Sequence, residues 1–302
     1  MKEHIVVDHI SKEFRDPKVC ALDNVSFTVK PGQLFGLIGA DGAGKTTLFR
    51  ILTTLLLADS GRAEVYGLDV VKDFKQLRSM IGYMPGRFSL YTDLSVEENL
   101  TFFATLHKTT VESGYHLIKD IYQQIEPFKD RRAGKLSGGM KQKLALSCAL
   151  IHQPKVLFLD EPTTGVDAVS RKEFWSMLLN IKAQGVTILV STPYMDEAVL
   201  CDEIGLIQNG KILSIDTPTG IISKFPEPLY AVESDDIGKL LKDISKVNGV
   251  KSSFSFGDAI HVTMIDGEID ELKNGLQNLG YLNVVVKPIV PTIEDCFIRL
   301  MQ

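Results

Sequence analysis

The residues best suited to chemistry lie in one glycine-rich stretch that follows an apolar run and leads into a helix-like segment. The spacing matches G-x-x-x-x-G-K-[ST], a loop that binds nucleotide phosphates. Glycines allow such a loop to turn tightly and to point its N–H groups inward. The lysine would contact the β- and γ-phosphates, and the threonine after it would bind Mg²⁺ through its hydroxyl. The stretch consists of Gly39, Ala40, Asp41, Gly42, Ala43, Gly44, Lys45, Thr46 and Thr47.

Two consecutive carboxylates, Asp160 and Glu161, follow the fully apolar run at 156–159. Such a run is typical of a buried parallel strand, and α/β sheets bind ligands at the carboxyl ends of such strands. The first acid could hold Mg²⁺, and the second could orient or deprotonate an attacking water. Acids of this kind can also simply end a strand, but the phosphate loop in the same chain favours the functional interpretation.

Two further features allow more than one interpretation. Ser137, Gly138 and Gly139 precede a helical pattern, so they form either an ordinary helix cap or a second anion-binding helix end. Phe14 is expected in a short connection at 12–15, where its ring either packs on the core or stacks on an adenine.

The elements that must position these residues alternate between strands and helices, which predicts an α/β fold. Strands are expected at 4–10, 24–30, 34–38, 156–159 and 186–190, with a hairpin at 204–213 and a helix beginning within 191–198. Helical signals are concentrated at 94–132, where Ser95 and Glu98 form a capping-box pattern. Prolines and a glycine at 216–228 indicate a boundary, and the order βαββαβ after it predicts a small ferredoxin-like domain followed by a last helix.

Composition narrows the class of protein. The chain has 302 residues and a formal net charge of −5, which argues against a dedicated nucleic-acid binder. The four cysteines are far apart and are expected to be small buried side chains in a reducing compartment. Neither a signal peptide nor an apolar run of about 18 residues is evident, so we expect a soluble cytoplasmic protein.

Taken in order, these motifs resemble those of the ATP-binding subunit of an ABC transporter. The match covers residues 1 to about 220: Gly39–Thr47 is similar to the Walker A loop, LSGGM at 136–140 to the signature, and 156–161 to Walker B. GYMP, YMDEA and the C-terminal PTIEDCF resemble the ABC-2 exporter branch. The implied fold is an α/β P-loop NTPase of the ABC type over 1–220, with a helical subdomain at about 90–150 and an α+β ferredoxin-like domain at 226–302.

The resemblance also implies a mechanism and a set of partners. ATP and Mg²⁺ would be the cofactors, Thr46 and Asp160 the metal ligands, Glu161 the catalytic residue, and Phe14 the adenine platform. Ser137, Gly138 and Gly139 would contact an ATP held by a second nucleotide-binding subunit. The partners would be ABC-2 type membrane permease subunits and not nucleic acid, and the chain would lie at the cytoplasmic face of the plasma membrane.

Two positions depart from the family pattern. Gly86 stands where the family has a glutamine, and Pro193 where it usually has a histidine that contacts the γ-phosphate. Neither residue offers a polar side chain. One hypothesis is therefore an active exporter ATPase, and another is a partly degenerate subunit that pairs with a second, active ATPase. A third, a soluble ABC ATPase acting on ribosomes or DNA, is disfavoured because the chain has one cassette and is acidic.

Overall fold

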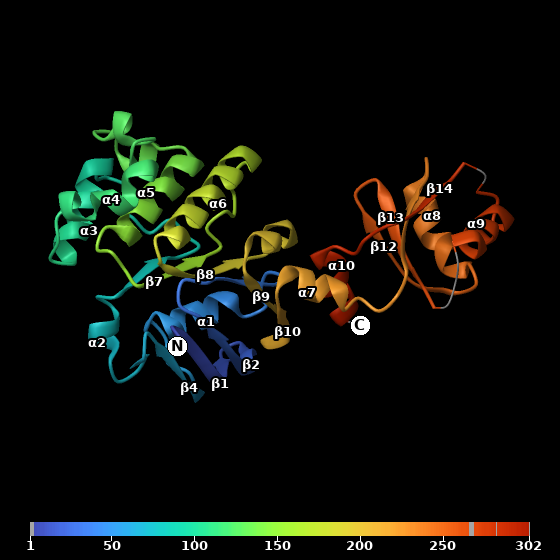
Figure 1. The fold of residues 1–302 in the computed structure, drawn as a ribbon, viewed down its shortest axis with the longest axis horizontal. Coiled ribbons are helices and arrows are strands. Elements are labelled where there is room, and N and C mark those ends of the chain that lie inside the picture. The colour runs from blue at the N-terminus through green and yellow to red at the C-terminus, as the bar shows by residue number, and fades with distance from the viewer. Residues whose placement is uncertain (1–2, 266–268, 282, 302) are drawn as a thin grey trace. The chain divides into compact units, whose positions relative to one another are not determined.

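The computed structural model describes residues 3–265, 269–281 and 283–301. The chain divides into two compact units, with the division between Thr219 and Gly220 (Figure 1).

A six-stranded sheet forms the centre of the first unit. Its strand order is β10-β9-β3-β8-β7-β6, and all neighbours are parallel except β9 and the edge strand β10. Every residue of β3 and β7 is buried, as their apolar sequences predict for strands covered on both faces. Helices α1 and α6 lie on opposite sides of this sheet (Figure 1). These elements are β3 (Leu34–Ile38), α1 (Lys45–Leu52), β6 (Ile81–Met84), β7 (Val156–Asp160), α6 (Ala168–Ala183), β8 (Thr187–Thr192), β9 (Glu203–Gln208) and β10 (Lys211–Asp216).

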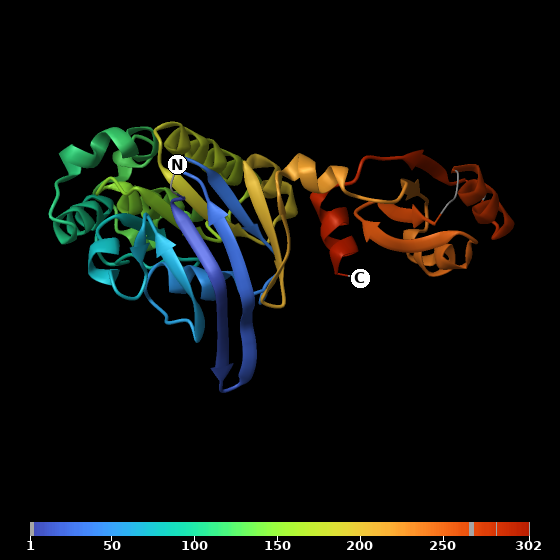
Figure 2. The same ribbon diagram turned by 60° about the horizontal axis from the view of Figure 1, so that its bottom comes forward.

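A second, antiparallel sheet contains a long hairpin that corrects one prediction. The strand order is β2-β1-β4-β5, from β1 (Ile5–Arg15), β2 (Lys18–Val29), β4 (Ser60–Val65) and β5 (Leu68–Asp69). The connection expected at 12–15 is the end of β1, where Phe14 pairs with Val19 of β2 (Figure 2). Much of this part of the hairpin is exposed, so it lacks the apolar alternation that marks a half-buried strand.

The helical region lies between β6 and β7, as predicted. The capping box is present: Ser95 Oγ accepts from the Glu98 N–H, and the Glu98 carboxylate accepts from the Ser95 N–H. Two such bonds satisfy donors that the first turn of a helix leaves free. The elements are α3 (Val96–Leu106), α4 (Val111–Tyr122), η1 (Glu126–Phe128), η2 (Ala133–Lys135) and α5 (Gly138–Leu150).

Two short helical segments complete the first unit. One is α2 (Phe74–Leu77). The other is η3 (Met195–Leu200), a 3₁₀ segment that replaces the helix expected to begin within 191–198. Strand β8 continues to Thr192 because Leu37 and Ile38 of β3 extend the pairing through Ser191 and Thr192.

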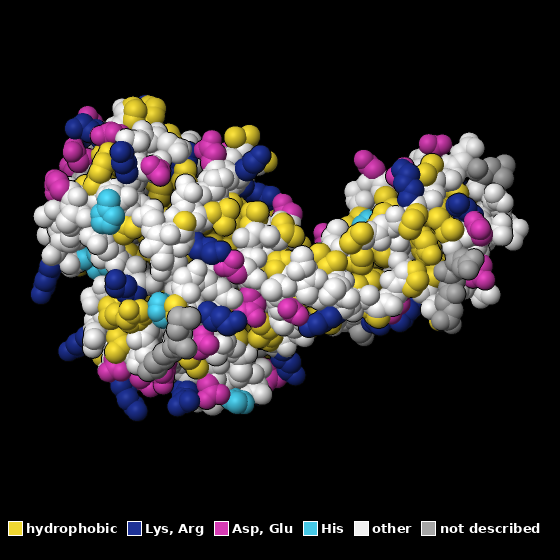
Figure 3. Space-filling view, viewed as in Figure 1, with side chains coloured by type: hydrophobic (Ala, Val, Ile, Leu, Met, Phe, Trp, Pro, Cys, Tyr) yellow, Lys and Arg dark blue, Asp and Glu magenta, His cyan; other side chains and the backbone are white. Residues whose placement is uncertain are grey.

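The second unit is built around a four-stranded antiparallel sheet of order β12-β13-β11-β14. With the helices between the strands, this is the predicted βαββαβ order. Side chains such as Val232, Ile260 and Val262 form its core with Leu240 and Leu272 from the helices. Hydrophobic side chains also gather over β12 and β13 on the face drawn in Figure 3. The elements are α7 (Pro218–Ser223), β11 (Leu229–Glu233), α8 (Ile237–Asp243), η4 (Ile244–Lys246), β12 (Val250–Phe256), β13 (Ala259–Met264), α9 (Ile269–Asn278), β14 (Val285–Pro288) and α10 (Ile293–Leu300).

The cysteine prediction is wrong at one position. Cys148, Cys201 and Cys296 are buried, but Cys20 is exposed on the β1–β2 hairpin. Among the described residues, no helix is long and apolar enough to cross a bilayer.

Candidate nucleotide-binding site

The predicted phosphate loop connects β3 to α1, and its glycines are required by close packing. A Cβ on Gly39 would lie 2.2 Å from the carbonyl oxygen of Ile207. Gly44 has a φ of +106°, and a Cβ there would lie 2.3 Å from the carbonyl oxygen of Ala21. Larger residues cannot fit at these two positions without moving neighbouring backbone.

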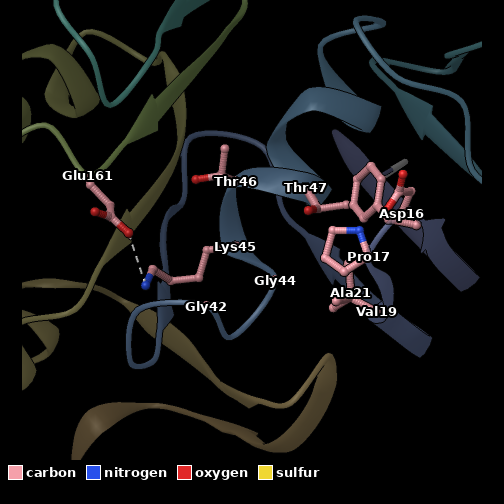
Figure 4. A pocket seen from close by; sticks show the side chains of 11 residues that line it. Asp16, Pro17, Val19, Ala21, Gly42, Gly44, Lys45, Thr46, Thr47 and Glu161 are labelled. Carbon is pink, nitrogen blue, oxygen red and sulfur yellow. Dashed lines mark ion pairs between the residues drawn. The ribbon is translucent and has the colours of Figure 1, made fainter.

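Lys45 is held by three oxygen atoms although it is only 2% exposed. Its Nζ donates to the carbonyl oxygens of Gly39 (2.8 Å) and Ala40 (3.0 Å). It also forms an ion pair with Oε1 of Glu161 at 3.0 Å, drawn as the dashed line in Figure 4. Two of the three ammonium donors are therefore used by loop carbonyls, and the charge is balanced by the Glu161 carboxylate.

The two predicted carboxylates lie at the end of β7, beside the end of β8. Asp160 is 1% exposed, and its Oδ1 accepts from Ser191 Oγ at 2.7 Å. Burial raises the pKa of Asp160, while hydrogen bonds from Ser191 and Thr46 partly oppose the shift. A buried carboxylate next to the Thr46 hydroxyl has the oxygen donors that Mg²⁺ prefers, so these residues fit the predicted metal ion.

Glu161 has an unusual backbone for a residue with a side chain, with a φ of +50°. Its N–H donates both to the carbonyl oxygen of Ser191 (3.1 Å) and to Ser191 Oγ (3.0 Å). The side chain is 21% exposed and reaches Lys45, so the carboxylate lies at the cavity.

A cavity of about 360 Å³ lies along the phosphate loop. Lys45 and Glu161 lie toward one end, and Pro17, Val19 and Ala21 of the hairpin lie toward the other (Figure 4). One end is therefore charged and the other largely apolar, a combination that suits a nucleotide. The lining residues are Phe14, Asp16, Pro17, Val19, Ala21, Gly42, Gly44, Lys45, Thr46, Thr47 and Glu161.

The hairpin supplies the lining residues that the sequence did not reveal. Phe14 lies on this wall and is 38% exposed, with Lys12 Nζ 5.9 Å from its ring centroid. Asp16, Pro17 and Val19 were missed because an exposed hairpin carries no motif. The only available signal was their closeness in sequence to Phe14.

The predicted second anion-binding helix end is not part of this cavity lining. Ser137 caps α5, its Oγ accepting from the Met140 N–H at 3.3 Å. Ser137 and Gly138 are exposed, and a Cβ on Gly139 would lie 2.8 Å from Ser170 Oγ. This helix end thus presents N–H groups on the surface of the first unit.

Both departures from the family pattern adjoin the acidic pair. A Cβ on Gly86 would lie 3.0 Å from the carbonyl oxygen of Asp160 and 3.8 Å from Cβ of Glu161. Pro193 follows directly after Thr192, the last residue of β8, and Ser191 of that strand holds the Glu161 N–H. A side chain at position 86 would therefore lie near Glu161, and position 193 follows the strand that holds the Glu161 N–H.

Comparisons with known proteins agree with the motifs. The family profile for the ABC transporter matches residues 22–164. Nod factor export ATP-binding protein I of Burkholderia lata is 32% identical over 296 residues, which are 97% of this chain and 95% of that protein. The chain belongs to the ABC transporter family. This confirms the predicted family and its α/β ABC ATPase fold, whereas the roles of individual site residues stay predictions.

Other relatives of this ABC ATPase chain support the same family assignment. The probable multidrug ABC transporter ATP-binding protein YbhF of Escherichia coli is 37% identical over 302 residues, 98% of this chain. The chain spans about half of that relative, covering 52% of its length. Among solved structures, cbiO1 from Clostridium perfringens, part of the complex cbiONQ, matches with a TM-score of 0.66 and 26% identity, covering 74% of this chain and 92% of that one.

Proposed function

We propose that this chain is the ATP-binding subunit of an ABC-2 type exporter, which couples ATP binding and hydrolysis to transport by a separate membrane permease. The observation that carries the proposal is that Lys45, Thr46 and Glu161 line one cavity, with the buried Asp160 next to Glu161 at the end of β7. The names of two relatives support export: one is a Nod factor export protein and another a daunorubicin resistance protein.

The residues of the site have distinct roles in this proposal. The loop N–H groups and Lys45 bind the phosphates, and the hairpin wall with Phe14 contacts the base. Thr46 and Asp160 hold Mg²⁺, which when bound offsets charge on the phosphate oxygens. Glu161 orients the attacking water and can accept its proton, because its carboxylate reaches the cavity from the end of β7.

A second nucleotide-binding subunit completes the site in this proposal. Ser137 and Gly138 are exposed at the start of α5 and are not among the described residues that line the cavity. Their helix end would bind the γ-phosphate of an ATP held by the partner, since helix N-termini attract anions. The partner is either a second copy of this chain or a different ATPase subunit.

An apolar groove of about 400 Å³ offers a place for the permease. Its wall includes Leu90, Phe103 and Leu106. The rings of His107 and His152 also line it and stack at 3.7 Å. Burial lowers the pKa of His152 to about 4, so this side chain is uncharged at neutral pH.

Two residues that line the groove are adjacent in sequence to Gly86, which lies beside the acidic pair Asp160 and Glu161. They are Met84 and Pro85, which directly precede Gly86. A permease segment in the groove would therefore contact the segment that leads to the site. The chain would then lie at the cytoplasmic face of the membrane, attached through the permease.

The groove is tested by placing a charge in it. Leu106→Asp should abolish co-purification with the permease while nucleotide binding is retained, because Leu106 is 61% exposed and lines the groove. Val71→Asp is the matched control, since Val71 is 54% exposed and is not among the groove residues. Equal co-purification by the two variants would count against this docking site.

The proposed activity is tested by ATP hydrolysis with the permease encoded nearest to this chain. Wild-type complex should hydrolyse ATP about 10²- to 10³-fold faster than Glu161→Gln, the typical cost of removing one preorganised catalytic contact. Equal rates for the two proteins would reject hydrolysis at this site.

A second candidate is a slow subunit that pairs with a more active ATPase, and Gly86 and Pro193 favour it. Restoring both side chains, as Gly86→Gln with Pro193→His, should then raise turnover. Gly86→Ala is the control, because it adds the Cβ that must fit 3.0 Å from the Asp160 carbonyl without adding a polar group. If the double variant turns over no faster than the wild type, these two positions do not limit the rate.

A further inference from the structure

A buried carboxylate near the site has no role in the mechanism above. Glu197, in η3, is 3% exposed, and its Oε2 accepts two hydroxyl hydrogen bonds. One comes from Thr163 Oγ1 at 3.1 Å and the other from Thr192 Oγ1 at 2.5 Å. Thr163 lies two residues after Glu161, and Thr192 ends β8, so one oxygen atom joins two loops of the site.

The hydrogen bond between Glu197 and Thr192 is connected to the phosphate loop through the backbone of Thr192. Thr192 Oγ1 also accepts from the Tyr194 N–H at 3.1 Å, which fixes the turn around Pro193. The carbonyl oxygen of Thr192 accepts from the N–H of Gly39, the first loop residue, at 3.3 Å. Fixing Thr192 therefore also fixes the place where the phosphate loop begins.

The bond to Thr163 stabilises the segment that carries Glu161. The positive φ of Glu161 is strained for a residue with a Cβ, and such strain persists only where the surroundings impose it. On the β8 side, Ser191 holds the Glu161 N–H. After Glu161, its carbonyl oxygen accepts from the Thr164 N–H at 3.2 Å, and Thr163 is tied to Glu197.

The other carboxylate oxygen faces a cation. Oε1 of Glu197 has no hydrogen-bond partner, and Nε of Arg171 lies 3.7 Å from the carboxylate. Arg171 also donates to Asp196 at 2.8 Å and lies over the Tyr194 ring, 4.4 Å from its centroid. A buried carboxylate is costly unless it is paired. Here one oxygen accepts two hydroxyl hydrogen bonds and the other is paired with a guanidinium at 3.7 Å, and these three groups come from three different segments.

We propose that Glu197 is a positioning residue for ATP hydrolysis, which accepts the Thr163 and Thr192 hydroxyls and so holds Glu161 against the end of β8. This inference rests on the proposed hydrolysis at this site. Glu197 is not among the described residues that line the nucleotide cavity, and it acts through Glu161.

The decisive variants are at Thr163, which is 1% exposed. Thr163→Val keeps the shape of the side chain and removes the hydroxyl, whereas Thr163→Ser keeps the hydroxyl. We expect Thr163→Val to lower kcat by about tenfold, the effect of one lost buried hydrogen bond to a charged group. KM for ATP should stay about the same, and Thr163→Ser should restore most of the rate.

Combining Thr163→Val with Glu161→Gln distinguishes a positioning role of Thr163 from a general loss of structure. In the Glu161→Gln protein, Thr163→Val should cause no further loss of single-turnover rate, because the residue that it positions is already inactive. Glu197→Gln and Glu197→Leu extend the test if Thr163→Val does not fold: the amide oxygen still accepts both hydroxyls, and leucine accepts neither. We expect Glu197→Gln to retain most of the rate and Glu197→Leu to lose about tenfold or more.

The outcomes are distinguishable. Wild-type kcat in Thr163→Val, an equal loss in Thr163→Ser, or a full additional loss in the Glu161→Gln background would each overturn the positioning role while leaving the proposed function intact. If the wild-type complex hydrolyses ATP no faster than Glu161→Gln, the proposed function fails and the positioning role fails with it.

Discussion

The ion pair between Lys45 and Glu161 predicts that the proposed catalytic carboxylate opposes nucleotide binding. Lys45 Nζ already lies within 3.0 Å of three oxygen atoms, so a phosphate that approaches it competes with one of them. Two are backbone carbonyls of the loop itself, and the third is the movable Glu161 side chain. The carboxylate must then either leave the lysine or stay beside an anionic phosphate, and both raise the Kd.

The size of the effect follows from the exposure of the two side chains. The side chain of Lys45 is 2% exposed and that of Glu161 is 21% exposed. The free-energy contribution of this ion pair should therefore lie between those of exposed pairs and of fully buried pairs. Exposed pairs contribute about 0.2–1 kcal/mol, and breaking a fully buried pair costs about 3–5 kcal/mol. An intermediate value of about 1.4 kcal/mol corresponds to a tenfold change in Kd. Glu161→Gln should therefore bind nucleotide about tenfold more tightly than the wild type.

The assay is isothermal titration calorimetry with a non-hydrolysable ATP analogue in EDTA, which removes hydrolysis and Mg²⁺ from the comparison. Glu173→Gln is the matched control: it makes the same chemical change in an ion pair with Lys143, 2.8 Å apart, that does not line the cavity. Its Kd should equal that of the wild type. An unchanged or weaker affinity for Glu161→Gln would refute the idea that this pair competes with phosphate.

Three further predictions concern packing, pH and thiol access. Gly44→Ala should weaken nucleotide binding at least about 100-fold by calorimetry, because its Cβ meets backbone, whereas Gly42→Ala should do so less because its Cβ meets nothing within 4 Å. Glu227 is partly buried, which raises its pKa, but hydrogen bonds from Arg299 and Lys251 outweigh this and lower it overall. Its stabilising contribution is therefore complete above its unfolded pKa, near 4.5, and is lost as pH falls through the lower folded value. Glu227→Gln should lower the stability of the second unit by about 1–2 kcal/mol in urea unfolding at pH 7, and by less near pH 3, and an equal effect at both would contradict the assignment. With Ellman's reagent one thiol, Cys20, should react quickly in the native protein and all four after denaturation, and fast reaction of a second native thiol would contradict the burial of the others.

The parts of the fold that the sequence predicted are those whose signals are local. The strand at 34–38, the glycine loop and the start of α1 follow one another directly, so spacing alone determines their arrangement. The capping box before α3 and the order of strands and helices in the second unit likewise depend on residues that are close in sequence. The acidic pair was found because parallel strands place their carboxyl ends along one edge.

The parts that were missed depend on contacts between distant segments or on exposed backbone. The end of the β1–β2 hairpin is held by pairing of two exposed strands, for which hydrophobic periodicity gives no signal. Glu197 lies 34 residues from Thr163, and in the sequence it is one of two adjacent acids within 191–198. Only the fold brings its carboxylate to the two hydroxyls.

We expect the residues at positions 86 and 193 to change contacts with bound ATP rather than the packing of the site. The acidic pair is held by Ser191 and by backbone bonds, and none of these bonds needs a side chain at 86 or 193. Lys45 and the loop glycines, which we propose bind phosphate, lie on a different segment from both positions. In the second candidate function, the missing contacts are those that a glutamine or histidine would make to the γ-phosphate and water during reaction. A loss confined to such contacts lowers kcat and leaves nucleotide affinity and stability unchanged. This pattern separates a slow but well-folded ATP site from a collapsed one.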